Sequence, residues 1–191
     1  MTEIVFASHN AGKIKEVQEL LAPFGYVILS ADAVNLPDVE ENGTTFVENA
    51  LLKARAAFEA TGKPSVADDS GLCVTALNDA PGVYTARYAK KMGGYEKAFE
   101  DLLSRTKENR AAHFCCAIAY VDGQTEQTFE GRVDGLLVEP QKGNEGFGFD
   151  PIFKPNGYEA TFACLFSDIK NKISHRACAL QSFLEFIRRK V

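Results

Sequence analysis

Two strand-like segments in the second half of the chain meet at an Asp-Gly pair, and this feature constrains the fold more than any other. Residues 113–121 and 125–133 flank Asp122-Gly123, and the second segment ends at another such pair, Asp134-Gly135. An Asp-Gly pair between two strands is typical of a β-hairpin. The chain is therefore predicted to form a partly antiparallel sheet, with the second strand of the hairpin ending at Asp134-Gly135.

The first thirty residues indicate parallel strands as well. Residues 3–7 are a short apolar segment, residues 13–21 carry apolar side chains at helical spacing, and residues 26–29 are apolar again. This order predicts a strand, a helix and a second strand, as in a βαβ unit. Together with the hairpin, it predicts an α/β fold with a mixed sheet flanked by helices.

A further helix is marked by its N-terminal cap. Thr45 and Glu48 have the spacing of a capping box, in which each side chain bonds to the backbone of the other residue. Lys53 lies well away from the apolar face of this helix, so it is expected to meet solvent or a ligand. The apolar spacing also predicts helices over residues 95–106 and 175–189.

Length and net charge limit the number of domains and the kinds of partner that this chain can have. A chain of 191 residues with 46% hydrophobic content is the size of one domain, which predicts a single unit over residues 1–191. The 21 basic and 26 acidic side chains give a net charge of -5, which argues against a nucleic acid polymer as partner. A signal peptide and long apolar runs are both absent from the sequence, so we expect a soluble cytoplasmic protein without a membrane segment.

The cysteines predict a reducing compartment and no metal chemistry. They are odd in number and lack the C-x-x-C spacing of a structural zinc site or a redox motif. We expect them to be small buried apolar residues. They are Cys73, Cys115, Cys116, Cys164 and Cys178.

A polar loop between the first strand and the first helix is the first candidate binding segment. It consists of Ser8, His9, Asn10, Ala11, Gly12 and Lys13. The N–H groups at a helix N-terminus attract phosphate, and Lys13 would add a mobile cation. The spacing is not that of a P-loop, so the sequence does not support an ordinary ATPase. A plain turn with a surface lysine is the alternative.

Paired carboxylates form the second candidate segment. Asp68 and Asp69 follow an apolar strand and precede Ser70-Gly71. Neighbouring side chains on a strand face opposite sides, so only one of the two should face a cleft. A carboxylate at a strand end can hold Mg²⁺ or accept a proton from water, and Glu40 or Glu41 would supply a second ligand. A solvated turn is the alternative structure for this segment.

Two segments near the C-terminus complete the candidates. His175 and Arg176 lie in the first turn of the last helix, where the helix dipole disfavours cations, so they suggest a bound anion. Residues 146–151 alternate glycines with aromatic rings, which suits the stacking of a base, although a core loop has the same composition.

Six motifs follow one another along nearly the whole chain. They are S-H-N-x-G-K at 8–13, E-E-N-G-T-T-F-x-E-N-A at 40–50, A-D-D-S-G-L at 67–72, P-G-V-Y-T-A-R-Y at 81–88, G-F-G-F-D-P-I-F at 146–153 and S-H-R at 174–176. In this order and spacing they resemble the inosine triphosphate pyrophosphatase family, also called the Ham1 or RdgB-like family. The resemblance implies a two-lobed mixed sheet with a central active-site cleft, and Mg²⁺-dependent hydrolysis of ITP, dITP and XTP to monophosphate and pyrophosphate.

The resemblance also implies a role for each matching residue. Asp69 would be the general base and a Mg²⁺ ligand, with Glu41 or Glu40 beside it. The loop 8–13 and Lys53 would hold the triphosphate, and Ser70 would contact the substrate. The residues that would enclose the purine or contact its 6-keto group are Phe147, Gly148, Phe149, Asp150, Lys170, His175 and Arg176, with Lys172 as an alternative to Lys170. The family resemblance further implies a homodimer that cleanses the nucleotide pool.

Two other functions are the alternatives. A Maf-like pyrophosphatase of similar fold would act on modified pyrimidine or methylated nucleotides, and the S-H-R and G-F-G-F-D-P motifs argue against it. A nucleotide-sensing or RNA-binding module would need a basic face with exposed aromatic rings, which the acidic composition does not favour.

Overall fold

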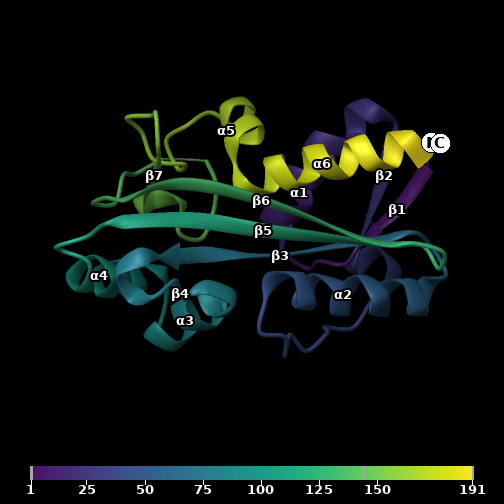
Figure 1. Cartoon of the computed structure of the whole chain (residues 1–191), viewed down its shortest axis with the longest axis horizontal. Coiled ribbons are helices and arrows are strands. Elements are labelled where there is room, and N and C mark those ends of the chain that lie inside the picture. The colour runs from purple at the N-terminus through teal and green to yellow at the C-terminus, as the bar shows by residue number, and fades with distance from the viewer. Residues whose placement is uncertain (1, 144, 191) are drawn as a thin grey trace. The chain divides into compact units, whose positions relative to one another are not determined.

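The strands of the computed structural model, which describes residues 2–143 and 145–190, form one mixed sheet (Figure 1). The strands are β1 (Thr2–Phe6), β2 (Tyr26–Ser30), β3 (Ser65–Val74), β4 (Ala80–Pro81), β5 (Ala111–Val121), β6 (Glu126–Leu137) and β7 (Phe153–Pro155). The helices are α1 (Ala11–Leu21), α2 (Phe46–Thr61), α3 (Thr85–Met92), α4 (Tyr95–Arg105), α5 (Ser167–Ile173) and α6 (His175–Lys190). The strand order is β2-β1-β3-β5-β6-β7, and β4 pairs with β3.

The sheet contains both parallel and antiparallel strand pairs, and β5 and β6 of the predicted hairpin are neighbours in it. β1 runs parallel to β2, with Ile4 opposite Ile28, and parallel to β3, with Phe6 opposite Val66. β4 pairs antiparallel with β3, and β7 pairs antiparallel with β6. The α/β class and the opening βαβ unit are therefore confirmed.

The prediction that the second hairpin strand ends at Asp134-Gly135 is wrong. β6 continues to Leu137, and Gly135 pairs with Pro155 of β7. A Cβ atom at this position would collide with the backbone carbonyl oxygen of Lys154. Gly135 therefore allows β6 and β7 to approach each other closely. Besides turns, close backbone approach is a common reason for a glycine inside a strand.

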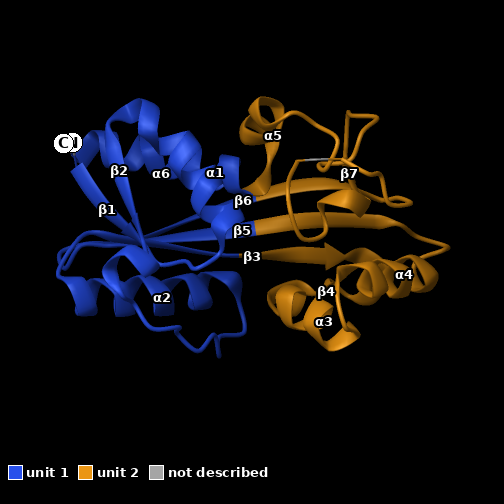
Figure 2. Ribbon diagram, turned by 180° about the vertical axis from the view of Figure 1, so that it is seen from behind, with its two compact units in different colours: residues 1–69, 116–131, 176–191 blue, residues 70–115, 132–175 orange. Residues whose placement is uncertain are grey.

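The described residues divide into two compact units, coloured in Figure 2. Unit 1 comprises the described residues of 1–69, 116–131 and 176–191, and unit 2 comprises those of 70–115 and 132–175. The boundaries fall inside β3, β5 and β6 and after the first residue of α6, so neither unit is a continuous segment. This interleaving explains why the sequence shows no linker.

Unit 1 buries both faces of its strands beneath helices (Figure 1). Apolar side chains of α1 and α6, including Leu21 and Phe183, pack with Ile4 and Phe6 of β1. Residues of α2 pack on the opposite face against Ala67 of β3 and against alanines of β5. Small side chains on this second face let α2 approach the sheet closely.

Helix α2 begins at the predicted capping box. The Thr45 side chain accepts a hydrogen bond from the Glu48 backbone N–H at 3.1 Å, and the Glu48 carboxylate accepts one from the Thr45 N–H at 3.2 Å. The Lys53 side chain is largely shielded from solvent, since it is 13% exposed and pairs with Glu41, and the expectation that it meets a ligand stays a prediction. A polar position on a helix can be covered by a neighbouring loop, which periodicity does not reveal.

Unit 2 has its own aromatic core. Phe114 of β5 packs edge-on against Phe153 of β7, with ring centroids 4.7 Å apart, and Phe162 joins the cluster. Apolar residues of α3 and α4, including Phe99 and Leu102, extend it. Within the part of the chain that the structure describes, no helix has the length and apolar character needed to cross a membrane.

Candidate active site

The loop between β1 and α1 is organised by its own side chains. The Asn10 side chain caps α1 by accepting a hydrogen bond from the Lys13 backbone N–H at 3.1 Å. The Ser8 hydroxyl in turn accepts one from the Asn10 N–H at 3.2 Å. These two hydrogen bonds hold the loop against the start of α1. The free backbone N–H groups of a helix N-terminus favour the binding of phosphate.

Other residues of the same loop have different surroundings. His9 is exposed, and its Nδ1 lies 2.6 Å from Asp32 Oδ1. Ala11 is exposed and Gly12 is half-buried in the first turn of α1. The position of His9 beside Asp32 ties the loop to the segment after β2.

Asp68 is the centre of a buried ion network in unit 1. Its Oδ2 atom lies 3.1 Å from Lys13 Nζ and 3.0 Å from Arg176 Nη2. Burial acts to raise the pKa of this carboxyl, but Lys13, Arg176 and Lys53 together hold the pKa far below its ordinary value. Asp68 is therefore ionised at all physiological pH values, and it fixes the position of the two cations that contact it.

Arg176 binds carboxylates of the protein itself. Its guanidinium contacts Glu16 of α1 as well as Asp68, and its side chain is 1% exposed. The sequence interpretation was that a cation at this helix N-terminus indicates a bound anion, and the anions are these two side chains. In this structure the Arg176 guanidinium contacts these two carboxylates, and its contact with a purine stays a prediction.

Asp69 faces the other side of the sheet and has a different environment. Its Oδ2 atom accepts a hydrogen bond from Asn49 Nδ2 of α2 at 2.9 Å. Burial raises the pKa of this carboxyl, and the nearby negative charge of Glu41 adds to the rise, while Lys53 and Asn49 oppose it. A carboxylate with a raised pKa is a better proton acceptor, as a general base requires.

The two aspartates lie inside a strand. β3 continues through Ser70 and Gly71 to Val74, so the alternative of a solvated turn is wrong, and so is the placement at a strand end. The strand geometry explains the opposite orientations of Asp68 and Asp69. Ser70, the next residue, is half-buried.

Of the two glutamates before α2, one belongs to this cluster. Glu41 pairs with Lys53, and both act electrostatically on Asp69. Burial acts to lower the pKa of Lys53, but the charges of Asp68, Glu41 and Asp69 raise it overall, so the ammonium stays protonated. Glu40 is exposed. The geometry therefore favours Glu41 as the carboxylate beside Asp69.

Gly43 allows the glutamate segment to lie directly on α2. Its backbone N–H donates a hydrogen bond to Asn49 Oδ1 at 2.8 Å. A Cβ atom at this position would lie 2.7 Å from Asn49 Oδ1 and 2.7 Å from Glu48 Cβ. Asn49 thus links this segment to Asp69. No role was predicted for Asn49 from the sequence, although an amide among the alanines of this helix was a visible signal.

A second cluster lies in unit 2 and involves the glycine-rich loop. Lys170 Nζ lies 2.7 Å from Asp150 Oδ2, and both side chains are 5% exposed. Asp150 also accepts a hydrogen bond from the Phe147 backbone N–H at 2.8 Å, and the Lys170 ammonium lies 5.0 Å from the centre of the Phe147 ring. Lys172 is exposed, so Lys170 is the lysine that meets the loop.

Two aromatic positions differ in accessibility. Phe149 is 2% exposed and packs against Tyr88, Tyr95 and Phe99, so its ring is part of the core and is not available to stack on a base. This corrects the sequence interpretation of Phe149. The Phe147 ring and Gly148 are half-buried.

His175 is buried in unit 2 by an aromatic contact. Its ring stacks on Phe114 at 4.7 Å between centroids and 13° between planes. Such stacking fixes the plane of the imidazole and therefore the directions of its two nitrogen atoms.

Comparison with known proteins places this arrangement in a family. The sequence profile described as the Ham1 family matches residues 4–186. The chain belongs to the Ham1 family. Among the relatives of this Ham1 chain are two proteins that are named dITP/XTP pyrophosphatase. The one from Streptomyces coelicolor is 46% identical over 98% of each chain. The one from Zymomonas mobilis is 44% identical over 95% of this chain and 90% of the relative.

Solved Ham1 structures have the same fold. The Ham1 protein of Staphylococcus aureus is 38% identical over the full length of both chains, with a TM-score of 0.86. A HAM1 protein of Coxiella burnetii is 40% identical over 99% of this chain and 100% of that chain, with a TM-score of 0.85. These matches confirm the recognised family and fold, and they give the Maf-like alternative no support.

Proposed function

We propose that this Ham1 chain hydrolyses non-canonical purine nucleoside triphosphates, ITP, dITP and XTP, to the monophosphate and pyrophosphate. The observation that carries the proposal is the pair of opposed aspartates on β3, one fixed by two cations and one with a raised pKa. Full-length relatives named dITP/XTP pyrophosphatase support the substrate class. The activity removes damaged nucleotides from the nucleotide pool.

The phosphate-binding part of the proposal uses residues of unit 1. The N-terminus of α1, capped by Asn10 and aligned by Ser8, offers backbone N–H groups to phosphate oxygens. Lys13 and Lys53 carry positive charge that would oppose the negative charge developing on the leaving pyrophosphate. Asp68 keeps the Lys13 ammonium in place before substrate arrives.

Asp69 is proposed as the general base and as a ligand of Mg²⁺, with Glu41 as a second ligand. The donor set fits the ion, because carboxylate oxygens are the side-chain ligands that Mg²⁺ prefers. The ion would neutralise charge on the phosphates. Asp69 would accept the proton of the attacking water, and its hydrogen bond from Asn49 at 2.9 Å holds the carboxylate in one orientation.

Recognition of the base is proposed for the unit 2 cluster. The Phe147 ring would stack on the purine, and Lys170 and His175 would donate hydrogen bonds to its 6-keto oxygen. Adenine presents an amino group at this edge, so a buried donor would be left without an acceptor and ATP would be rejected. Asp150 orients Lys170 and also the backbone of the loop.

The decisive experiment measures pyrophosphate release from ITP, dITP, XTP, GTP and ATP at equal concentration with magnesium. We expect kcat/KM for ITP, dITP and XTP to exceed that for ATP by at least about tenfold, the effect of one unpaired buried donor. Equal turnover of ATP and ITP would refute the account of the 6-keto group. Release of phosphate in place of pyrophosphate would refute the proposed reaction.

We also propose that the protein is a cytoplasmic homodimer that requires Mg²⁺. Light scattering should then give a mass twice the 20.9 kDa of one chain. Dialysis against a chelator should abolish turnover, and magnesium should restore it. A monomer mass, or full activity after chelation, would contradict the respective part of the proposal.

A further inference from the structure

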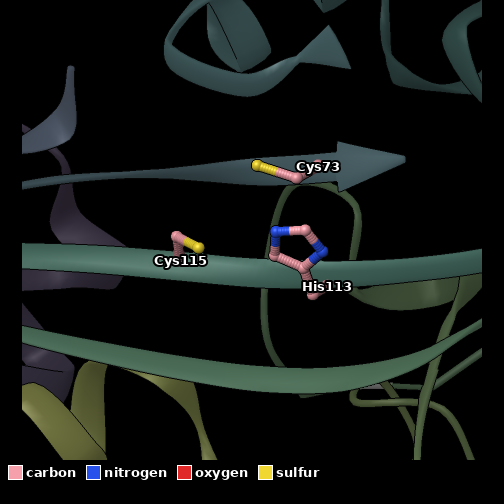
Figure 3. A group of neighbouring side chains, drawn as sticks. All are labelled: Cys73, His113 and Cys115. Atoms are coloured by element: carbon pink, nitrogen blue, oxygen red, sulfur yellow. The ribbon is translucent and has the colours of Figure 1, made fainter. Parts of the chain in front are cut away.

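Two cysteines and a histidine that are distant in sequence come together in unit 2. Cys73 lies on β3, and His113 and Cys115 lie on β5, which is the neighbouring strand in the sheet. Residues 113 and 115 are alternate positions of one strand, so their side chains share a face of the sheet. Figure 3 shows the two thiols and the imidazole gathered over these two strands.

The ligand atoms of the three side chains lie close together. The two Sγ atoms and an imidazole nitrogen all lie within 4.8 Å of one another. In the described part of the chain, this is the one group of at least three histidine, cysteine or carboxylate side chains that meets this criterion. Ligands of a tetrahedral zinc ion, bound at about 2.0–2.3 Å, are about 3.5–3.8 Å apart. A shift of about 1 Å, within the reach of small side-chain rotations, would complete such a geometry.

The chemistry of the three ligands favours zinc over magnesium. Sulfur and imidazole nitrogen are ligands for zinc, whereas Mg²⁺ prefers the oxygens of carboxylates and water. Two thiolates would also balance the charge of a divalent ion, which makes its partial burial acceptable. Cys73 and His113 are buried, and Cys115 is half-buried.

Charged side chains lie near the cluster. The charged side chains that act on His113 are those of Arg132, Asp79 and Asp134. Arg132 and Asp134 pair with each other at 2.7 Å and are both more than half exposed, so one edge of the cluster is close to solvent. The half-buried Cys115 is the ligand beside which water would occupy the fourth position of a tetrahedral site.

We propose that Cys73, His113 and Cys115 bind one zinc ion. The ion ties β3 to β5 within unit 2, and water completes its coordination. The sequence prediction that the cysteines have no metal chemistry rested on the missing C-x-x-C spacing, but these ligands come from two strands. The site shares no residue with the candidate active site, so the proposal does not depend on the proposed hydrolysis.

The test begins with metal-free protein prepared under reducing conditions. Zinc is added in excess, unbound ion is removed on a desalting column, and zinc per chain is counted by elemental mass spectrometry. We expect one zinc ion per chain. Each of Cys73→Ala, His113→Ala and Cys115→Ala should lower zinc affinity at least about tenfold in competition with a chromogenic chelator.

Matched controls separate this site from thiols in general. Cys164 and Cys178 are exposed cysteines elsewhere in the chain, and Cys164→Ala and Cys178→Ala should keep full zinc binding. Magnesium-dependent turnover in the ligand variants should stay within about twofold of the unmodified protein, which verifies their folding. Cys115→Ala removes the most exposed of the three ligands and is the variant least prone to misfold.

A spectroscopic readout needs no variant. Cobalt added to the metal-free protein should give the near-ultraviolet thiolate-to-cobalt charge-transfer band of a tetrahedral site, and zinc should displace it. Absence of this band would overturn the proposal. Zinc retention equal in the Cys73→Ala, Cys115→Ala double variant and the unmodified protein, or less than one ion per ten chains, would overturn it too.

Discussion

Asp68 and Asp69 are neighbours in sequence, yet their pKa values shift in opposite directions. Both are buried, and burial acts to raise both pKa values. Lys13 and Arg176 lie against Asp68 and reverse the shift, whereas Asp69 has an amide from Asn49 and the nearby charge of Glu41. Asp68 therefore stays ionised as the counterion of two cations, and Asp69 takes up a proton at a higher pH than an ordinary aspartate does.

Asp69→Asn should separate catalysis from stability. We expect kcat to fall about 100- to 10,000-fold, because the proposed general base is removed. Since the folded-state pKa of Asp69 is raised, the ionised carboxylate destabilises the fold at pH values above that pKa. The variant should therefore have an equal or higher melting temperature at pH 7 without magnesium. A clear loss of melting temperature, or near-normal turnover, would contradict this assignment.

Arg176→Gln should be strongly destabilising because it leaves two buried carboxylates with one cation fewer. The expected loss is about 3–5 kcal/mol in the free energy of unfolding, measured with urea. Arg55, whose guanidinium forms an exposed pair with Glu126 at 2.6 Å, is the matched control. Arg55→Gln should cost no more than about 1 kcal/mol. Equal losses in the free energy of unfolding of the two variants would show that the buried ion network stabilises the fold no more than an exposed ion pair does.

At the scale of elements, helix α2 positions much of the candidate site. Its capping box fixes Thr44 and Thr45, its fourth residue is Asn49, and its eighth is Lys53. The segment before the helix approaches closely enough for Glu41 to reach Lys53 because residue 43 is a glycine. Through the side chains of Asn49 and Lys53, the helix therefore links the segment before it to Asp69 on β3.

Gly43→Ala tests this close approach. The new Cβ must displace Asn49, which orients Asp69, so we expect kcat to fall at least about tenfold while KM changes less. Gly157→Ala is the control, because Gly157 has a φ of +85° and open space around its Cβ position. The control should lose about 1–2 kcal/mol of stability and little activity. Unchanged steady-state kinetics in Gly43→Ala would exclude a positioning role for the contact.

At the scale of the whole molecule, the carboxyl groups predict the response to acid. The pKa values of Glu48, Asp68, Asp101, Asp122, Glu126 and Asp134 are lowered, and that of Asp69 is raised. For Asp122, burial acts to raise the pKa, but hydrogen bonds from Lys190, Gln124, Thr125 and Tyr120 bring it to about 2. Lowered values outnumber the raised one, so ionised carboxylates stabilise the fold as a whole.

The free energy of unfolding should therefore fall as the pH is lowered. A group with a depressed folded-state pKa contributes its full stabilisation above its unfolded-state pKa of about 4, and the contribution disappears as the pH approaches the folded-state pKa. Urea denaturation at pH values between about 6 and 2 should show a continuous decline, steepest below about pH 4. A constant or rising stability over this range would contradict the prediction.

Most of the elements could be predicted from the sequence because their causes are local. The capping box of α2, the start of α6 at His175 and the opening βαβ unit depend on side chains within a few residues of each other. The motifs likewise identified the family, which the full-length relatives confirm. The continuation of β6 beyond Gly135 depends on its pairing with β7, a partner outside any local pattern.

What the sequence by itself determined is therefore the class of fold, the family and the list of charged residues that could serve a polyphosphate. Tertiary structure alone decided which charges meet. Arg176 contacts Asp68 across more than a hundred residues of chain, Phe149 is enclosed by α3 and α4, and Cys73 reaches the strand that carries His113 and Cys115. The physical reason is that the energies of ion pairs and of metal coordination depend on the distance between the groups and on their burial. The residue pattern of a single helix or strand determines neither the distance to a remote residue nor the burial.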